Sequence, residues 1–275
     1  MPLLRFLRLA LLAASIALPS LACGIPATER AMALSRQHRD AEGIKVLYAR
    51  LAMHPEDIAA RRLLIRMLAV ESDMPGVRAE VELLRERLPA GDPSASIELG
   101  HAFELTHQFE EALRAYDAAA SEAPLSPAGP REGGMRCARW NEVEEARPRL
   151  EEAVRRGARD AETYHVLGLV LVKLGDLDAA EQAYRAGAAA DAKGVENWLG
   201  LATVAVIRKD GAAALDAYDH ILAKNKTYGP AELGRAWALA LLGRKDEARR
   251  ALDHAEELGA PAANIAKQRA ALGSP

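Results

Sequence analysis

The chain has 275 residues, of which 50% are hydrophobic and only 4% aromatic, and its formal net charge is -3 at pH 7. This charge argues against the basic excess of nucleic-acid binders, and 20 glycines, 14 prolines and 2 cysteines argue against collagen-like and disulfide-scaffold classes. Small and aliphatic side chains must therefore fill the interior, which favours packed helices over a β-sandwich.

The first element, residues 1–22, is predicted to be an export signal and not part of the fold. Arg5 and Arg8 form a positive region, residues 9–18 form an apolar stretch, and Ser20 and Ala22 are small residues three and one positions before a possible cleavage site. The sequence therefore predicts an exported protein that faces the periplasm.

Cys23 directly follows this signal, and a cysteine there resembles the lipobox of bacterial lipoproteins, in which the thiol is diacylated. Ser20 and Leu21 depart from the usual lipobox, which has leucine and then a small residue at these places. The alternatives are ordinary cleavage before an incidental cysteine, giving a soluble periplasmic protein, and an uncleaved anchor over the 20 uncharged residues 9–28. With Cys23 lipidated, the following Gly24 favours an outer-membrane lipoprotein.

The remaining sequence repeats at a shift of 34 residues. Five segments align without a gap: 93–126, 127–160, 161–194, 195–228 and 229–262. In each segment the eighth slot is small, the twentieth is alanine and the twenty-fourth is large. The eighth slots hold Gly100, Gly134, Gly168, Ala202 and Ala236, and the twenty-fourth hold Tyr116, Leu150, Tyr184, Tyr218 and Leu252.

This pattern resembles the tetratricopeptide repeat. The best copy, 161–194, carries seven family positions: Tyr164, Leu167, Gly168, Leu171, Gly175, Ala180 and Tyr184. In this copy we expect helices from Glu162 to Leu174 and from Leu177 to Ala190, with Gly175 taking a left-handed turn conformation between them. The resemblance implies an all-α, right-handed α-solenoid of about seven helical hairpins plus a C-terminal capping helix.

In chain order, we expect degenerate repeat units over 23–92, five regular units over 93–262, and a capping helix with a tail over 263–275. Unit 127–160 is unusual because three prolines and three glycines lie between residues 124 and 134. Its first helix is predicted to start no earlier than Pro130. The unit is either a distorted repeat or a flexible joint, and Cys137 within it is predicted to be a buried, inert thiol.

In this family the first helix of each hairpin lines the concave surface, so its exposed slots are candidate ligand contacts. In the last three units these slots are mostly apolar. We define the groove residues as His165, Leu169, Val172, Leu199, Thr203, Val206, Ile207, Leu233, Trp237 and Leu241. The same slots of unit 127–160 hold Ala128, Arg131, Met135, Ala138 and Arg139.

A contiguous apolar surface generally marks a partner site. The groove residues predict binding of an amphipathic helix or an extended apolar segment, with Trp237 as an anchor. The basic-and-asparagine clamp of chaperone-binding family members is missing, so capture of an acidic C-terminal tail is not expected. The alternative is that some of these residues pack against the neighbouring first helix and that the capping helix covers Trp237 and Leu241.

No motif for catalysis, for a cofactor or for a metal is present. The sequence has no zinc-protease pattern, phosphate loop or dinucleotide fingerprint, and His101 and His107 do not share a helical face. We therefore expect no enzyme, no cofactor, no small-molecule substrate and no nucleic-acid partner. The resemblance to small repeat lipoproteins, including the type IV pilotin and tight-adherence pilus lipoproteins, implies an assembly factor for a pilus or secretion system.

Two further functions stay open. One is an adaptor that presents clients to a periplasmic protease or peptidoglycan hydrolase, and the other is an accessory subunit of a large envelope complex. The repeats themselves do not specify which partner is bound.

Overall fold

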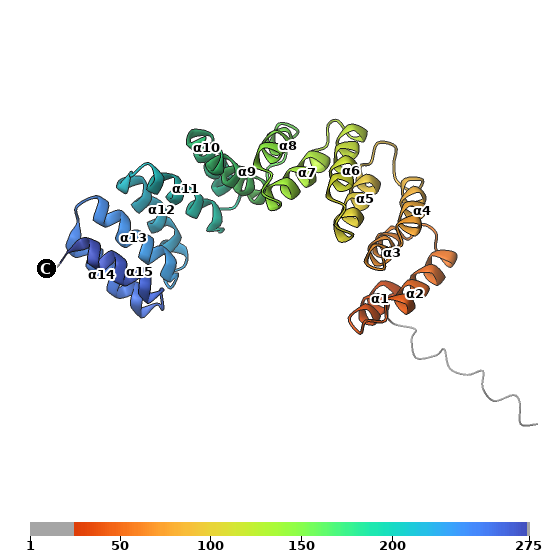
Figure 1. Ribbon diagram of the computed structural model, residues 1–275, viewed down its shortest axis with the longest axis horizontal. Helices are drawn as coiled ribbons and strands as arrows, with labels where there is room; N and C mark the ends of the chain where they lie inside the picture. Colours follow the sequence, from red (N-terminus) through yellow and green to blue (C-terminus); the bar gives the residue numbers. More distant parts are fainter. Residues whose placement is uncertain (1–24, 274–275) are drawn as a thin grey trace, which may run out of the picture. The chain divides into compact units, whose positions relative to one another are not determined.

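The computed structural model describes residues 25–273, so the predicted export signal and Cys23 lie outside the described residues. Within this range the chain forms fifteen α-helices and no strand (Figure 1). Their bounds are α1 Ala27–Ser35, α2 Asp40–Met53, α3 Ile58–Val70, α4 Met74–Arg85, α5 Ser94–Leu105, α6 Phe109–Glu122, α7 Ala128–Arg139, α8 Val143–Arg155, α9 Ala161–Lys173, α10 Leu177–Ala190, α11 Glu196–Ile207, α12 Gly211–Lys224, α13 Gly229–Leu241, α14 Lys245–Glu257 and α15 Ala262–Leu272. The prediction of an all-α fold of seven hairpins and a terminal helix is confirmed.

The described residues form two compact units. The first holds α1 to α4 and His101–Gln108, and the second holds Ala90–Gly100 and the chain from Phe109 onward. Within each unit, helices that follow one another along the chain pack together, as α3 does with α4 and α9 with α10. The Pro-rich segment 124–134 lies inside the second unit, where α7 packs against α6, α8 and α9. This packing favours a distorted repeat over a flexible joint.

In the first unit, aspartate caps start the helices of the second hairpin. The Asp57 side chain accepts a hydrogen bond from the Ala60 amide ahead of α3, and Asp73 accepts one from the Gly76 amide ahead of α4. Between these helices Arg61 and Glu80 form an ion pair, and only 4% and 7% of the two residues is exposed. The predicted degenerate units are therefore well-formed helical hairpins.

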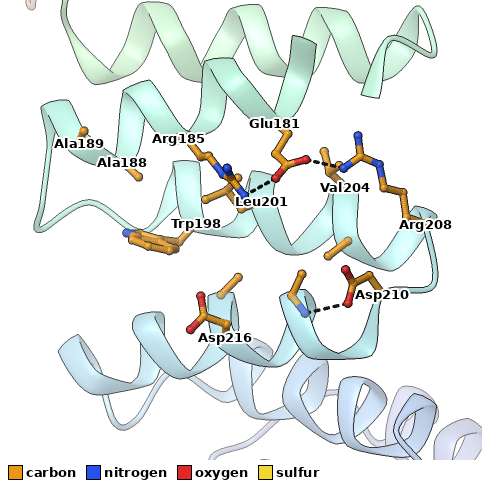
Figure 2. A pocket seen from close by; sticks show the side chains of 13 residues that line it. Glu181, Arg185, Ala188, Ala189, Trp198, Leu201, Val204, Arg208, Asp210 and Asp216 are labelled. Atoms are coloured by element: carbon orange, nitrogen blue, oxygen red, sulfur yellow. Dashed lines mark hydrogen bonds and ion pairs between the residues drawn. The ribbon is translucent and has the colours of Figure 1, made fainter. Parts of the chain in front are cut away.

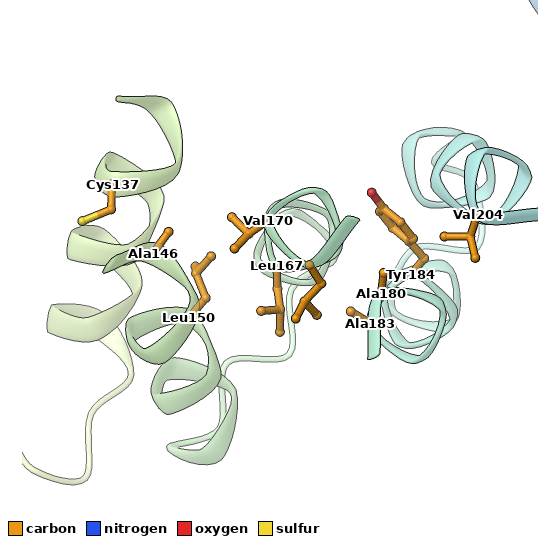
Figure 3. Close-up of a cluster of buried hydrophobic side chains, with 10 residues drawn as sticks. Cys137, Ala146, Leu150, Leu167, Val170, Ala180, Ala183, Tyr184 and Val204 are labelled. Carbon is orange, nitrogen blue, oxygen red and sulfur yellow. The ribbon is translucent and has the colours of Figure 1, made fainter. Parts of the chain in front are cut away.

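In the second unit, small residues let neighbouring helices approach the large side chain of the twenty-fourth slot. Tyr184 of α10 is 1% exposed and lies against Gly168 of α9 and Gly200 of α11, where a β-carbon would collide with the tyrosine ring. Figure 3 shows this ring between the side chains of α9 and Val204 of α11. The tyrosine therefore joins its own hairpin to the next one, as the repeat spacing predicts.

The turn inside each regular hairpin has a left-handed residue at the fifteenth slot. Gly175 and Gly243 have φ angles of 79° and 73°, so the predicted conformation of Gly175 is confirmed. The other three units place non-glycine residues there: His107, Asn141 and Lys209, with φ angles of 58°, 67° and 59°. This conformation is costly for most L-residues and easier for asparagine.

The predicted start of the helix in unit 127–160 is wrong. α7 begins at Ala128 with Pro127 as its N-cap, so Pro130 is the third helical residue. Proline is tolerated there because the amides of the first helical turn have no partner within the helix. Pro148 lies inside α8. The prediction of a buried thiol is confirmed, since Cys137 is 0% exposed and burial raises its pKa to about 11.

The terminal helix α15 closes the second unit. Ile265 and Leu272 are buried against α13 and α14, with exposed fractions of 1% and 6%. Gln268 is half-buried, and its amide donates a hydrogen bond to the Leu233 carbonyl at 3.2 Å. The helix therefore caps the last hairpin with both apolar and polar contacts.

Candidate functional site

The ten groove residues lie on α9, α11 and α13, and none of them is buried. Leu169, Ile207 and Leu241 are the most exposed apolar members, at 44%, 49% and 40%. On α11 the groove slots share one helical face, and Leu201 and Ala205 lie on the opposite face toward the interior of the unit. α9 packs directly against α11, so the groove residues of these two helices lie on adjoining helices.

The terminal helix α15 borders the groove residues of α13. Trp237 and Leu241 share a hollow of about 210 Å³ with Gln268 and Leu272 of α15. Leu233 packs against the buried cluster that contains Leu272. The capping helix therefore lies beside Trp237 and Leu241 but leaves Leu241 40% exposed.

His165 is the most polar groove residue and lies half-buried on α9. Its ring centroid is 6.0 Å from that of Tyr184, and its Nδ1 atom is buried without a hydrogen-bond partner among the described residues. Burial lowers the pKa of His165 below its ordinary value, although Glu196 and Glu162 act in the opposite direction. The neutral imidazole is therefore favoured near pH 7.

A second recess lies along α7 and α9. This cationic hollow has a volume of about 460 Å³ and is lined by Arg131, Glu132, Met135, Arg136, Ala138, Arg139, Val143, Glu162, Val166, Leu169, Val170 and Lys173. Leu169 belongs both to this hollow and to the groove. Arg131, Met135 and Arg139 occupy the corresponding slots of unit 127–160, but the predicted groove residues do not include them.

Arg131 joins α7 to the start of α9. Its guanidinium donates to Thr163 Oγ1 at 2.9 Å, to Asp160 Oδ1 at 3.2 Å and to Glu162 Oε2 at 2.7 Å. Burial would raise the pKa of Asp160, but the hydrogen bonds from Arg131 and Thr163 outweigh it and hold this pKa below its ordinary value. Arg131 is thus a structural cation whose charge is already compensated.

A third recess lies between α10 and α12, on the face of α11 that points away from the groove (Figure 2). This alanine hollow has a volume of about 530 Å³, and its charged rim includes Glu181, which is paired with Arg185 and Arg208. Its lining residues are Glu181, Arg185, Ala188, Ala189, Trp198, Leu201, Val204, Ala205, Arg208, Asp210, Ala213, Asp216 and Ala217.

The alanine hollow was not predicted, although the sequence contains a signal for it. In the repeat 195–228 the eleventh slot holds Ala205. The other four regular repeats have larger side chains there: Phe103, Cys137, Leu171 and Leu239. The missing side-chain volume on α11 leaves the space between α10 and α12 unfilled.

Two features are absent from residues 25–273. No group of three or more histidine, cysteine or carboxylate side chains is arranged to hold a metal ion in this part of the chain. Across the same range, every helix is too short or too polar to cross a membrane.

Comparison with known proteins identifies the repeat. Residues 161–193 match the family model of the tetratricopeptide repeat, and no curated protein matches the chain. Among solved structures, the C-terminal part of a TPR repeat-containing protein from Cytophaga hutchinsonii is similar with a TM-score of 0.65 at 14% identity, over 88% of this chain and 99% of that one.

Two shorter proteins are also similar. YrrB, a TPR protein with an unusual peptide-binding site, has a TM-score of 0.58 at 18% identity and covers 64% of this chain and 91% of its own. The MamA protein has a TM-score of 0.58 at 19% identity, with 62% and 93% covered. At these identities the likeness concerns the fold. The chain therefore has the tetratricopeptide-repeat fold, which is typical of non-enzymatic scaffolds that bind other proteins.

Proposed function

We propose that the chain is an exported, non-enzymatic scaffold that binds a segment of a partner protein along its groove residues. In this proposal a lipid on Cys23 holds it at the outer membrane, and its partner is a component of a pilus or secretion machine. Assembly of such a machine requires a subunit to be held without chemical change, which a rigid surface of stacked hairpins can do.

The observation that carries the proposal is the exposure of apolar groove residues on consecutive first helices. Leu169 of α9 and Ile207 of α11 leave almost half of their surface in solvent. Isolated exposed leucines are ordinary, but apolar side chains gathered on adjoining helices are the usual sign of a protein interface. An amphipathic helix would cover them through its own apolar face.

The groove can be tested with the double variant Leu169→Glu/Ile207→Glu of the tagged full-length chain. The partner is purified from detergent-solubilised membranes after cross-linking and is quantified by mass spectrometry against the wild type. We expect the charged side chains to abolish recovery of the partner, because a desolvated carboxylate against an apolar segment is strongly unfavourable. The mass of the purified chain also reports whether Cys23 is acylated.

The matched control is Leu125→Glu, at a loop leucine that is 91% exposed and outside the groove. This variant should recover the partner normally, and circular dichroism should show equal helix content for all three proteins. Unchanged recovery with the double variant would remove the groove from the proposal. Recovery of a hydrolase as the groove-dependent partner would instead favour the adaptor function.

A further inference from the structure

The charges of the cationic hollow do not balance. Four cationic side chains and two carboxylates line it. Both carboxylates are occupied: Glu132 accepts from Arg131 and Arg136, each at 3.2 Å, and Glu162 accepts from Arg131 at 2.7 Å. Two positive charges, those of Arg139 and Lys173, therefore remain without a counter-ion in the hollow.

Arg139 and Lys173 have no carboxylate within 4.0 Å in the described part of the chain. Lys173 Nζ donates to Asn141 Oδ1 at 2.7 Å, but this neutral acceptor leaves the ammonium charge uncompensated. Both residues are exposed and occupy the thirteenth slot of consecutive units. The other regular units have leucine or isoleucine in that slot, so the two cations mark one place along the surface.

Apolar side chains lie directly beside these cations. Met135 of α7 and Val166 of α9 line the same hollow, and Leu169 continues it into the groove. A volume of about 460 Å³ is in the range of sites that enclose a bound group. The recess thus offers an apolar floor with two unpaired cations.

We propose that the cationic hollow binds a carboxylate of the partner segment, with an adjacent apolar side chain resting on Met135 and Leu169. This inference deepens the proposed function and rests on it. A carboxylate would form charge-assisted hydrogen bonds with Arg139 and Lys173, which are stronger than neutral ones. Because Arg139 and Lys173 both lie at the α7 end of the groove residues, they would hold the acidic group of the segment at that end.

The test begins with a phage-displayed library of random 16-residue peptides selected on the purified full-length chain. We expect the enriched peptides to carry aspartate or glutamate close to a large apolar residue. The best peptide is then synthesised with a fluorescent label, and its affinity is measured by anisotropy for the wild type and for R139E/K173E. Loss of the charge-assisted contacts should weaken binding about tenfold or more.

Charge reversal makes the test specific. A peptide whose acidic residue is replaced by lysine should bind R139E/K173E better than it binds the wild type. The matched control K193E/K226E changes the net charge equally at two exposed lysines outside the hollow, and it should leave the affinity unchanged. Synthesis with a free or an amidated C-terminus shows whether a side-chain or a terminal carboxylate occupies the hollow.

The outcomes separate the two proposals. Enriched peptides without an acidic preference, or full affinity for R139E/K173E, would overturn the carboxylate site while leaving the groove intact. Failure to enrich any peptide above the background of the immobilising surface would count against the groove itself, and against the hollow with it.

Discussion

At the scale of the residue, the fifteenth slot shows that a repeat tolerates a residue for which the local backbone conformation is unfavourable. All five regular hairpins use the same left-handed turn, yet only two of them place glycine there. Lys209 adopts this conformation although, unlike glycine, it has a β-carbon, because the helices on either side fix the backbone. The packing energy of α11 and α12 therefore offsets a local backbone cost of about 1–2 kcal/mol.

This cost predicts that Lys209→Gly stabilises the protein. Removing the backbone strain at the turn should stabilise the protein by more than the added flexibility of glycine in the unfolded chain destabilises it. The free energy of unfolding should therefore rise by about 0.5–1 kcal/mol, measured by urea unfolding followed by circular dichroism. The reciprocal variant Gly175→Lys should lose about 1 kcal/mol, although nothing lies within 4 Å of its added β-carbon. Equal stability of both variants and the wild type would show that the turn carries no strain.

At the scale of the element, the Arg61–Glu80 pair joins α3 to α4. The Arg61 guanidinium also donates to the Pro55 carbonyl at 3.1 Å, so it connects α3 to the preceding loop as well. Both charges have left water, and each is therefore tolerable only in the presence of the other. The hairpin depends on this pair in a way that its aliphatic contacts do not.

Arg61→Met alone should destabilise the first unit by about 3–5 kcal/mol, because it leaves the Glu80 carboxylate buried without its cation. Adding Glu80→Leu to the same chain should restore most of the loss, since two apolar side chains can replace a buried ion pair at little cost. Urea unfolding of the single and double variants measures the difference. A double variant no more stable than Arg61→Met would contradict this account.

The elements were predictable to the extent that their side chains follow the repeat. α9 and α10 lie within one residue of the predicted bounds, because glycine, alanine and tyrosine recur at fixed slots. The start of α7 was missed because Pro127 acts as its cap. The alanine hollow was missed because it results from side-chain volume that Ala205 and Ala213 lack, and its size depends on three helices together.

The binding surface was only partly predictable for a similar reason. Helical periodicity is enough to place Leu169 and Ile207 on one side of their helices. It does not show which charged neighbours are already paired. Arg131 and Arg139 look equivalent in the sequence, but the first is bound by three acidic side chains and the second by none in the described chain.

At the scale of the whole molecule, stability is distributed along the sequence instead of being concentrated in one core. The second unit contains several buried clusters, such as that around Leu171 and Tyr184 and that around Leu239 and Leu252. In stacked repeats each cluster is maintained mainly by its sequence neighbours. A local defect should therefore stay local.

Ile265→Ala tests this locality. The lost methyl groups should cost about 2–5 kcal/mol at the cap. Hydrogen exchange followed by mass spectrometry should then show faster exchange in α13, α14 and α15, with α9 and α10 unchanged. Ala263→Gly, at an exposed position of α15, controls for fraying of the helix. Equally faster hydrogen exchange throughout α9 to α15 would mean that this part of the second compact unit opens in a single step.

The start of α1 limits the distance at which this helix could lie from a lipid attached to Cys23. Ala27 is the first helical residue and follows Cys23 by four positions. Even when fully stretched, four residues span at most about 14 Å. An acyl chain on Cys23 would therefore act as a short tether that holds the first hairpin close to the bilayer. Any protein that contacts this hairpin would then have to bind at the membrane surface.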